Sequence, residues 1–243
     1  MDNASYIALS RQRSLFIAME NIANNVANAN TTGFKSDTLI FQEYMMQNRI
    51  SDEELAFSHD VSSYTNYDQG GLVSTGRVYD VAIKGRGFFQ VETPLGERYT
   101  RVGNFVRNSE NFLATQEGYY VLGVNGERIA FQEEDQNFTV NSDGVIDVNG
   151  EPRGQLAVMD FENLQQLNKL GTGLYEYDNP GTLPYNSEQF TLVQGMLEQS
   201  NVNSIKEITR MIEVSRAVGS TSGFIQDVHD LQKKAVEAIS STQ

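Results

Sequence analysis

The side chains that most often carry catalysis or metal binding are scarce in this sequence. Its 243 residues include no cysteine and only two histidines, His59 and His229. Without cysteine, neither a disulfide nor a thiolate metal site can form. An isolated histidine needs further ligands and a group that holds its ring, so we expect both to be surface residues. A Ser-His-Asp triad is compatible with the composition, but the G-x-S-x-G turn of many serine hydrolases is absent.

Two short motifs resemble ligand-binding loops but lack the residues that would bind the ligand. Lys84-Gly85-Arg86-Gly87 has Gln90 where a phosphate loop needs its third glycine, and strand-like residues follow it. Asn141-Ser142-Asp143-Gly144 has Thr139 and Gly150 where a calcium loop needs acidic ligands. Both segments are predicted to be tight turns between strands. We therefore expect no catalytic, cofactor-binding or metal-binding residues, and no enzyme.

Net charge and hydropathy exclude two further classes of protein. The sequence has 32 acidic residues against 18 Lys and Arg, a net charge of −14, and no basic cluster. A nucleic-acid-binding surface needs such a cluster to displace counterions from phosphates, so no nucleic-acid partner is expected. No run of about 18 apolar residues occurs, which argues against membrane insertion. The opening residues lack the apolar core of a secretory signal, which by itself indicates a cytosolic protein.

Residues 1–34 are predicted to form an N-terminal helix. Apolar residues recur there at helical spacing, and the Asn- and Gly-rich segment 28–33 is a credible helix end. The stripe consists of Leu9, Phe16, Met19, Ala23 and Val26, widened by Tyr6, Leu15 and Ile22.

Residues 200–243 are predicted to form a long C-terminal helix. Ser204 and Glu207 have the spacing of a capping box, and Asn203 is the alternative N-cap. Gly219 and Gly223 weaken the helix internally. Its apolar stripe consists of Ile208, Met211, Val214, Val218, Ile225, Val228, Leu231 and Ala235.

Neither terminal helix has a partner nearby in the sequence. We therefore expect the two to pack on each other as an antiparallel or splayed coiled pair. A pair of helices still exposes apolar surface, which predicts further copies or related chains around it.

An extended arm and a β domain are predicted between the helices. Residues 35–69 are mostly polar and indicate an arm or linker, in which Phe41, Tyr44 and Met45 are compatible with a short helix. Residues 70–180 contain short Val-, Ile-, Phe- and Tyr-rich runs separated by turn pairs, which is typical of antiparallel strands. Residues 181–199 form the return segment. The predicted fold class is α+β, with terminal helices pairing as a coiled coil and a central all-β domain.

The N-terminal helix carries an unusual group of asparagines near its end, which are Asn21, Asn24, Asn25, Asn28 and Asn30. One interpretation is a polar face at a fraying helix end. The other is amide hydrogen bonding between subunits, where a buried asparagine fixes register at a cost in stability. The sequence leaves both open.

Five segments give the chain a resemblance to a known family. Residues 24–35, with sequence NNVANANTTGFK, resemble the N-terminal signature of flagellar rod and hook proteins. Residues 195–203, GMLEQSNVN, resemble their C-terminal signature. Residues 85–91, 99–105 and 118–123 resemble the central β region of the rod members. The sequence departs from the family pattern at Glu110-Asn111-Phe112, where members often carry a glycine. Within this family, the length of the chain and its opening residues Met1-Asp2 are most similar to those of proximal-rod proteins. Distal-rod proteins are the alternative.

The resemblance implies a structural role. Terminal helices of many subunits would form the inner tube of the rod, and the chain would be exported by the flagellar apparatus without a cleaved signal. Partners would be copies of the chain, other rod proteins and the export apparatus, and the rod would transmit torque. A secreted β-domain binding module is the alternative from another class. The predicted assembly interface comprises Leu9, Phe16, Met19, Asn24, Asn25, Val26, Asn28, Asn30, Phe34, Ile208, Met211, Val218, Ile225, Val228 and Leu231.

Overall fold

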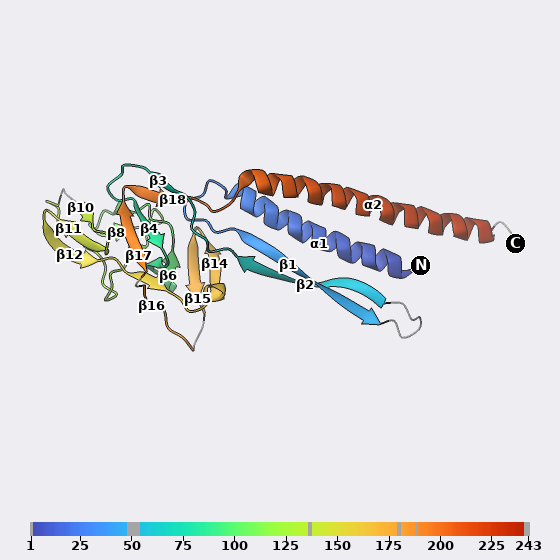
Figure 1. The fold of residues 1–243 in the computed structure, drawn as a ribbon, viewed down its shortest axis with the longest axis horizontal. Coiled ribbons are helices and arrows are strands. Elements are labelled where there is room, and N and C mark those ends of the chain that lie inside the picture. Colours follow the sequence, from blue (N-terminus) through green and yellow to red (C-terminus); the bar gives the residue numbers. More distant parts are fainter. Residues whose placement is uncertain (1, 48–53, 136–137, 179–180, 188, 241–243) are drawn as a thin grey trace. The chain divides into compact units, whose positions relative to one another are not determined.

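The computed structural model describes residues 2–47, 54–135, 138–178, 181–187 and 189–240. An N-terminal helix, a β-rich centre and a C-terminal helix follow one another along the chain, which confirms the predicted α+β class (Figure 1). The residues divide into two compact units. The helical unit comprises Met1–Ala27, Asp37–Asn66 and Asn203–Gln243, and the β unit comprises Asn28–Ser36 and Tyr67–Val202.

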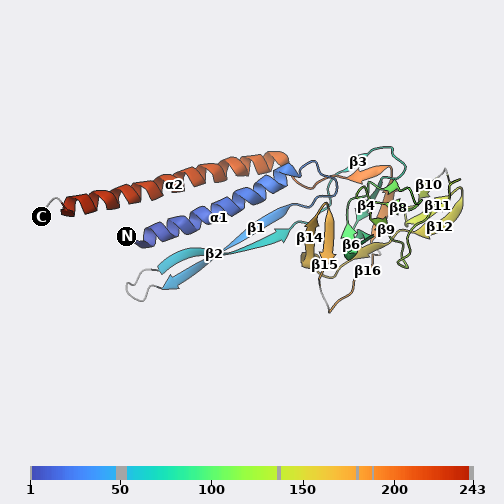
Figure 2. The same ribbon diagram turned by 180° about the vertical axis from the view of Figure 1, so that it is seen from behind.

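The helical unit contains two long helices, α1 (Asp2–Ala27) and α2 (Ser204–Ser240). They run side by side in opposite directions, and α2 extends beyond the start of α1 (Figures 1 and 2). Gln12 Nε2 of α1 donates a hydrogen bond of 3.0 Å to Ser222 Oγ of α2. The α1 helix ends before Gly33, whose φ of 68° is accessible mainly to glycine, as the sequence predicts.

The face of α1 that the chain buries differs from the predicted stripe. Ala8, Ile22 and Asn25 are buried, whereas Leu9 and Phe16 are 58% and 47% exposed. Leu9 and Phe16 of the predicted stripe therefore lie outside the surface that α1 buries within the chain. These two large apolar side chains of α1 are thus not enclosed by the helix pair.

Asn203, the alternative N-cap, begins α2 instead of the predicted capping box. Asn203 Oδ1 accepts a 3.1 Å hydrogen bond from the backbone N–H of Lys206, and its carbonyl accepts one from Glu207 N–H at 3.0 Å. The Glu207 carboxylate instead contacts Arg210 at 3.0 Å. An asparagine one residue earlier satisfies the free amide of the first turn, which makes the Ser204 hydroxyl dispensable there.

Residues of the predicted arm form a long antiparallel hairpin in the helical unit. Strands β1 (Asp37–Gln47) and β2 (Glu54–Thr65) pair from Asp37–Thr65 to Gln47–Glu54, with a register shift between Gln42 and Glu43. The short helix suggested for Phe41–Met45 is therefore wrong. A strand paired along its whole length satisfies every second amide and carbonyl with a partner, whereas an isolated helical turn gains little.

The β unit consists of short strands joined by tight turns. One sheet has the strand order β14-β15-β6-β5-β9-β8-β7, with β13 pairing to β5 and to β16. Three smaller sheets have the orders β10-β11-β12, β17-β4 and β18-β3. The elements are β3 (Leu72–Ser74), β4 (Val81–Gly85), β5 (Phe88–Thr93), β6 (Gly96–Thr100), β7 (Val106–Arg107), β8 (Leu113–Ala114), β9 (Tyr120–Val121), β10 (Phe138–Val140), β11 (Val145–Val148), β12 (Glu151–Gln155), β13 (Val158–Asp160), a 3-10 helix (Leu164–Gln166), β14 (Leu167–Gly171), β15 (Leu174–Tyr177), β16 (Tyr185–Asn186), β17 (Phe190–Gln194) and β18 (Met196–Glu198).

Turns of the β unit follow the sequence prediction closely. The strands β10 and β11 form a hairpin around the predicted turn at residues 141–144, with pairs from Phe138–Val148 to Val140–Ile146. Asn149 and Gly150 both have positive φ, as the tight turn between β11 and β12 requires. Lys84 and Gly85 end β4, and Arg86 and Gly87 connect it to β5, so the motif lies at a bend between two strands. Asn111 has a φ of 64°, so an asparagine adopts the left-handed conformation within Glu110-Asn111-Phe112, the segment that departs from the resembled pattern.

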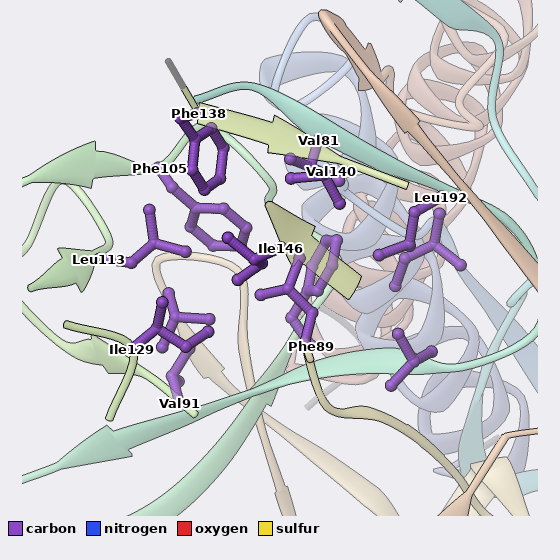
Figure 3. Close-up of a cluster of buried hydrophobic side chains, with 14 of the residues drawn as sticks. Val81, Phe89, Val91, Phe105, Leu113, Ile129, Phe138, Val140, Ile146 and Leu192 are labelled. Atoms are coloured by element: carbon purple, nitrogen blue, oxygen red, sulfur yellow. The ribbon is translucent and has the colours of Figure 1, made fainter. Parts of the chain in front are cut away.

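Two apolar clusters hold the β unit together. The larger lies between several sheets and includes Val81, Phe89, Leu113 and Ile146 (Figure 3). The smaller is aromatic: Phe88, Tyr99, Phe161 and Tyr175 are joined by edge-to-face contacts, including 4.8 Å between the ring centroids of Tyr99 and Phe161. The strands Phe190–Gln194 and Met196–Glu198 of the return segment also belong to this unit, through their pairing with β4 and β3.

Candidate functional site

Both signature segments meet inside the β unit. The Gly33 N–H donates a 2.7 Å hydrogen bond to the Glu198 carbonyl, and the Asn201 N–H donates one of 3.3 Å to the Phe34 carbonyl. The Asn201 side chain accepts a 2.8 Å bond from Ser36 N–H. Residues separated by more than 160 positions are therefore joined by backbone and side-chain hydrogen bonds.

A buried group of charges, the Lys35–Glu198–Arg101 cluster, lies at this meeting point. Lys35 Nζ is 2.7 Å from Glu198 Oε1, and Arg101 Nη1 is 3.2 Å from Glu198 Oε2. Lys35 is fully buried, and Glu198 is 1% exposed. The carboxylate oxygen Oε1 also accepts a 3.0 Å bond from the Gly70 N–H. One carboxylate thus neutralises part of the charge of two cations from distant segments.

Further contacts satisfy the two cations of the cluster. Lys35 Nζ donates to the Asp68 carbonyl at 2.7 Å, and Arg101 Nη2 donates to the Gly85 carbonyl at 2.9 Å. The Arg101 guanidinium lies 5.0 Å from the centre of the Phe88 ring, a cation–π distance. Burial lowers the pKa of Lys35 below its ordinary value, and the attraction of Glu198 opposes that shift. Burial also lowers the pKa of Arg101.

Glycines allow the segments of the cluster to approach closely. A Cβ atom at Gly70 would lie 1.9 Å from the Gln199 carbonyl oxygen, which is far inside contact distance. At Gly33 it would lie 2.9 Å from the backbone of Arg101, and φ is positive there as well. Any side chain at either position would separate the segments that carry Lys35, Arg101 and Glu198. The cluster is therefore a structural junction, whose three charged side chains are buried.

None of the three cluster residues was identified from sequence reasoning, although a signal was available. Each lies in one of the segments that carry the family resemblance. Lys35, Arg101 and Glu198 are the single charged residues of segments 24–35, 99–105 and 195–203, respectively. A lone charge in an otherwise uncharged segment indicates burial with a partner of opposite sign, because an unpaired buried charge is strongly unfavourable.

The helical unit holds most residues of the predicted assembly interface. Val26, Met19, Met211, Val218, Ile225 and Val228 are partly buried there. Leu9, Phe16, Ile208 and Leu231 are exposed, from 47% for Phe16 and Ile208 to 63% for Leu231. The first group is thus partly covered within the chain, whereas the second group is exposed on the two helices. The predicted interface residues of the two helices therefore fall into a partly buried set and an exposed set.

The asparagines near the end of α1 also differ in their burial. Asn25 is buried, with Nδ2 donating to the Asp37 carbonyl at 2.8 Å and Oδ1 accepting from Asp37 N–H at 3.1 Å. This amide is therefore used within the chain, between α1 and β1. Asn24 and Asn30 are exposed and Asn28 is half-buried. Phe34, which belongs to the β unit, has Lys169 Nζ 5.0 Å from its ring centre.

The described residues contain no group of three His, Asp or Glu side chains that could hold a metal. His229 is exposed on α2, and the side chain of His59 lies outside the described residues. In the described part of the chain, neither helix is sufficiently long and apolar to cross a membrane. The surfaces that remain as candidates for function are the exposed apolar side chains of α1 and α2.

Comparisons with known proteins agree with the arrangement of these segments. Residues 6–35 match the family "Flagella basal body rod protein", residues 82–148 match "Flagellar hook protein FlgE/F/G D1 domain", and residues 193–238 match "Flagellar basal body rod FlgEFG protein C-terminal". The chain is 38% identical to the flagellar basal-body rod protein FlgF of Caulobacter vibrioides, over 98% of each chain. It is 31% identical to FlgG of Bacillus subtilis, over 95% of this chain and 97% of the relative. FlgF of Mesorhizobium japonicum is 29% identical over 99% of each chain.

Proposed function

Because the chain belongs to the family of flagellar basal-body rod proteins, we propose that it is a structural subunit of the flagellar rod that assembles helically through its terminal helices. It is not an enzyme, since its relatives are structural proteins of the rod. It resides in the flagellar basal body and assembles with other rod proteins and with its own copies. The higher identity to FlgF than to FlgG favours the proximal rod over the distal rod.

The observation that carries this proposal is the apolar surface that the helical unit leaves uncovered. Ile205, Ile208 and Ile212 are 80%, 47% and 48% exposed on α2. Their spacing of three and four residues places them on one side of the helix. Large apolar side chains gathered in this way mark surfaces that bind other proteins. Neighbouring subunits would bury them, and a densely packed helical core would transmit torque.

The finer features of the proposal are a coiled-coil geometry of α1 and α2, a periplasmic position in the rod, and export without a cleaved signal. The antiparallel packing of the two helices supports the first. The absence of cysteine supports export as an unfolded chain, because no disulfide can hold the chain folded. Gly219 and Gly223 lower the intrinsic stability of α2, which would ease unfolding before passage through a narrow channel.

Incorporation into basal bodies tests the proposal. Ile212→Asp places a charge on the exposed face of α2, where it would be buried without a partner only after assembly. We expect its amount in purified basal bodies to fall about tenfold or more, with motility lost and the circular dichroism of the free chain unchanged. Leu95→Asp is the matched control, since Leu95 is 82% exposed in the β unit. Wild-type incorporation of Ile212→Asp would refute the assembly role of this face.

A further inference from the structure

A groove lies between α1 and α2 on the helical unit, with a volume of about 490 Å³. Ile7, Ala8 and Arg11 line it from α1, and Ala217, Thr221 and Phe224 line it from α2. Alanine, serine and threonine are too short to fill the space between the helix backbones, so the groove is hollow. Its lining is mostly apolar by surface, with Arg11, Ser220 and Thr221 as the polar members. A cavity of this size accommodates one or two large side chains.

Tyr6, Leu9 and Phe16 project from the opposite side of α1. They are 64%, 58% and 47% exposed. At about 100° of rotation per residue, these three positions face away from Ile7, Ala8 and Arg11. One helix therefore presents apolar side chains on one side and borders an apolar groove on the other. A contact in which one of these surfaces binds the other on a second copy is heterologous. Such a contact can be repeated from copy to copy without forming a closed dimer.

The distribution of charge favours a second copy of this chain as the occupant. Segments α1 and α2 together hold seven Lys or Arg residues and seven Asp or Glu residues, so the two helices carry no net charge. The whole net charge of −14 is carried by the remaining residues. Two copies that approach each other through their helices therefore avoid the electrostatic repulsion between the negatively charged residues outside α1 and α2. A strongly cationic partner would gain nothing at this groove.

We propose that Leu9 and Phe16 of one copy insert into the α1–α2 groove of the next copy. The proposal rests on the proposed function and adds to it the residues and polarity of the contact between copies. Each copy uses its groove for one neighbour and its Leu9 side for another. The contact is directional, which accounts for growth of a filament in place of a closed dimer.

Cysteine cross-linking in basal bodies tests this contact, because the natural chain has no cysteine. Leu9→Cys and Ala217→Cys are introduced into separate copies, which are co-expressed in a strain lacking the chain. A disulfide requires Cβ atoms about 3.5–4.5 Å apart, so oxidation of purified basal bodies should yield a cross-linked pair of chains. Ser215→Cys replaces Ala217→Cys in the control, since Ser215 is exposed on the other side of α2.

The expected result is a cross-link in the Leu9→Cys and Ala217→Cys mixture, about tenfold stronger than in the Ser215→Cys control, and none with either variant alone. No cross-link in basal bodies that contain both variants would overturn the groove contact and leave the rod assignment intact. A cross-link formed by Leu9→Cys alone would also overturn it, because it would show a symmetric contact. Absence of the unmodified chain from basal bodies would instead refute the proposed function.

Discussion

At the scale of single residues, the structure depends on how Glu198 balances two buried cations. Lys35 and Arg101 come from distant segments, and neither has another carboxylate at salt-bridge distance among the described residues. Moving such ions out of water costs several kcal/mol each, which only well-placed partners offset. The Arg101 Nε atom is buried and has no hydrogen-bond partner in the described part of the chain. The cluster therefore fixes the arrangement of segments more than it adds net stability.

Removing the charge of Glu198 should destabilise the β unit strongly. Glu198→Gln would leave Lys35 and Arg101 buried without a counter-charge, and we expect a loss of about 3–5 kcal/mol in the free energy of unfolding. Urea denaturation followed by tyrosine fluorescence measures it. Glu92→Gln is the control, since Glu92 pairs with Arg128 at the surface and its loss should change little. Equal effects of the two substitutions would contradict the role of the cluster.

Because Tyr99 is buried, we expect the folding stability of the chain to fall at alkaline pH. Burial, assisted by the charge of Glu97, raises the pKa of Tyr99 to about 12 from 10.0. The folded chain therefore keeps this proton at pH values where the unfolded chain has released it. Its contribution to stability is complete below pH 10 and declines as pH rises towards 12. Tyr99→Phe should flatten the fall in thermal stability over that interval, and an unchanged slope would count against the assignment.

At the scale of elements, the sequence indicated the helices and the hairpin turns because their signals are local. Helical spacing, the Asn149-Gly150 pair and the Asn203 cap act within a few residues. The β1–β2 hairpin has no comparable signal, because its register depends on pairing residues up to 28 positions apart. Likewise, helical spacing alone could not tell which apolar side chains of α1 meet α2 and which remain outside. The Lys35–Glu198–Arg101 cluster depends on long-range topology in the same way.

Substitutions at the start of α2 test whether Asn203 or Ser204 caps the helix. Asn203→Ala removes the oxygen that accepts the Lys206 amide hydrogen bond, and should cost about 1 kcal/mol of helix stability. Ser204→Ala should have a much smaller effect, because Asn203 already caps the helix. Far-ultraviolet circular dichroism during thermal unfolding of both variants measures this difference. A larger loss with Ser204→Ala would restore the capping box as the true helix start.

Two glycines within α2 can be tested for their cost to the helix. A Cβ atom at Gly219 or Gly223 would meet no atom within 4 Å. Each substitution by alanine should therefore stabilise the isolated chain by about 1 kcal/mol. The rise in helix melting temperature is the measurement, and a fall would show that a close contact requires glycine there. If ready unfolding matters for export, the double variant should also be secreted more slowly.

At the scale of the whole molecule, the β unit should fold without the helices. It draws on residues 28–36 and 67–202, so it needs the Lys35 segment and strands β17 and β18 besides the central strands. Asp37 and Thr65 pair directly, so a short Gly-rich turn can replace residues 38–64. The resulting fragment, residues 28–202, should unfold cooperatively. A fragment of residues 70–179 should be less stable, and equal stability would contradict this boundary.

Hydrogen exchange, compared between the free monomer and purified basal bodies, tests the central claim most directly. Helix formation in an isolated chain recovers little of the backbone entropy that it costs, about 1–2 kcal/mol per residue. Burial of the exposed apolar side chains by neighbouring subunits supplies the rest. We therefore predict weak protection of residues 5–27 and 205–235 in the monomer and strong protection in basal bodies, with β5 and β6 protected in both. Equally strong protection of both helices in a verified monomer would contradict the account.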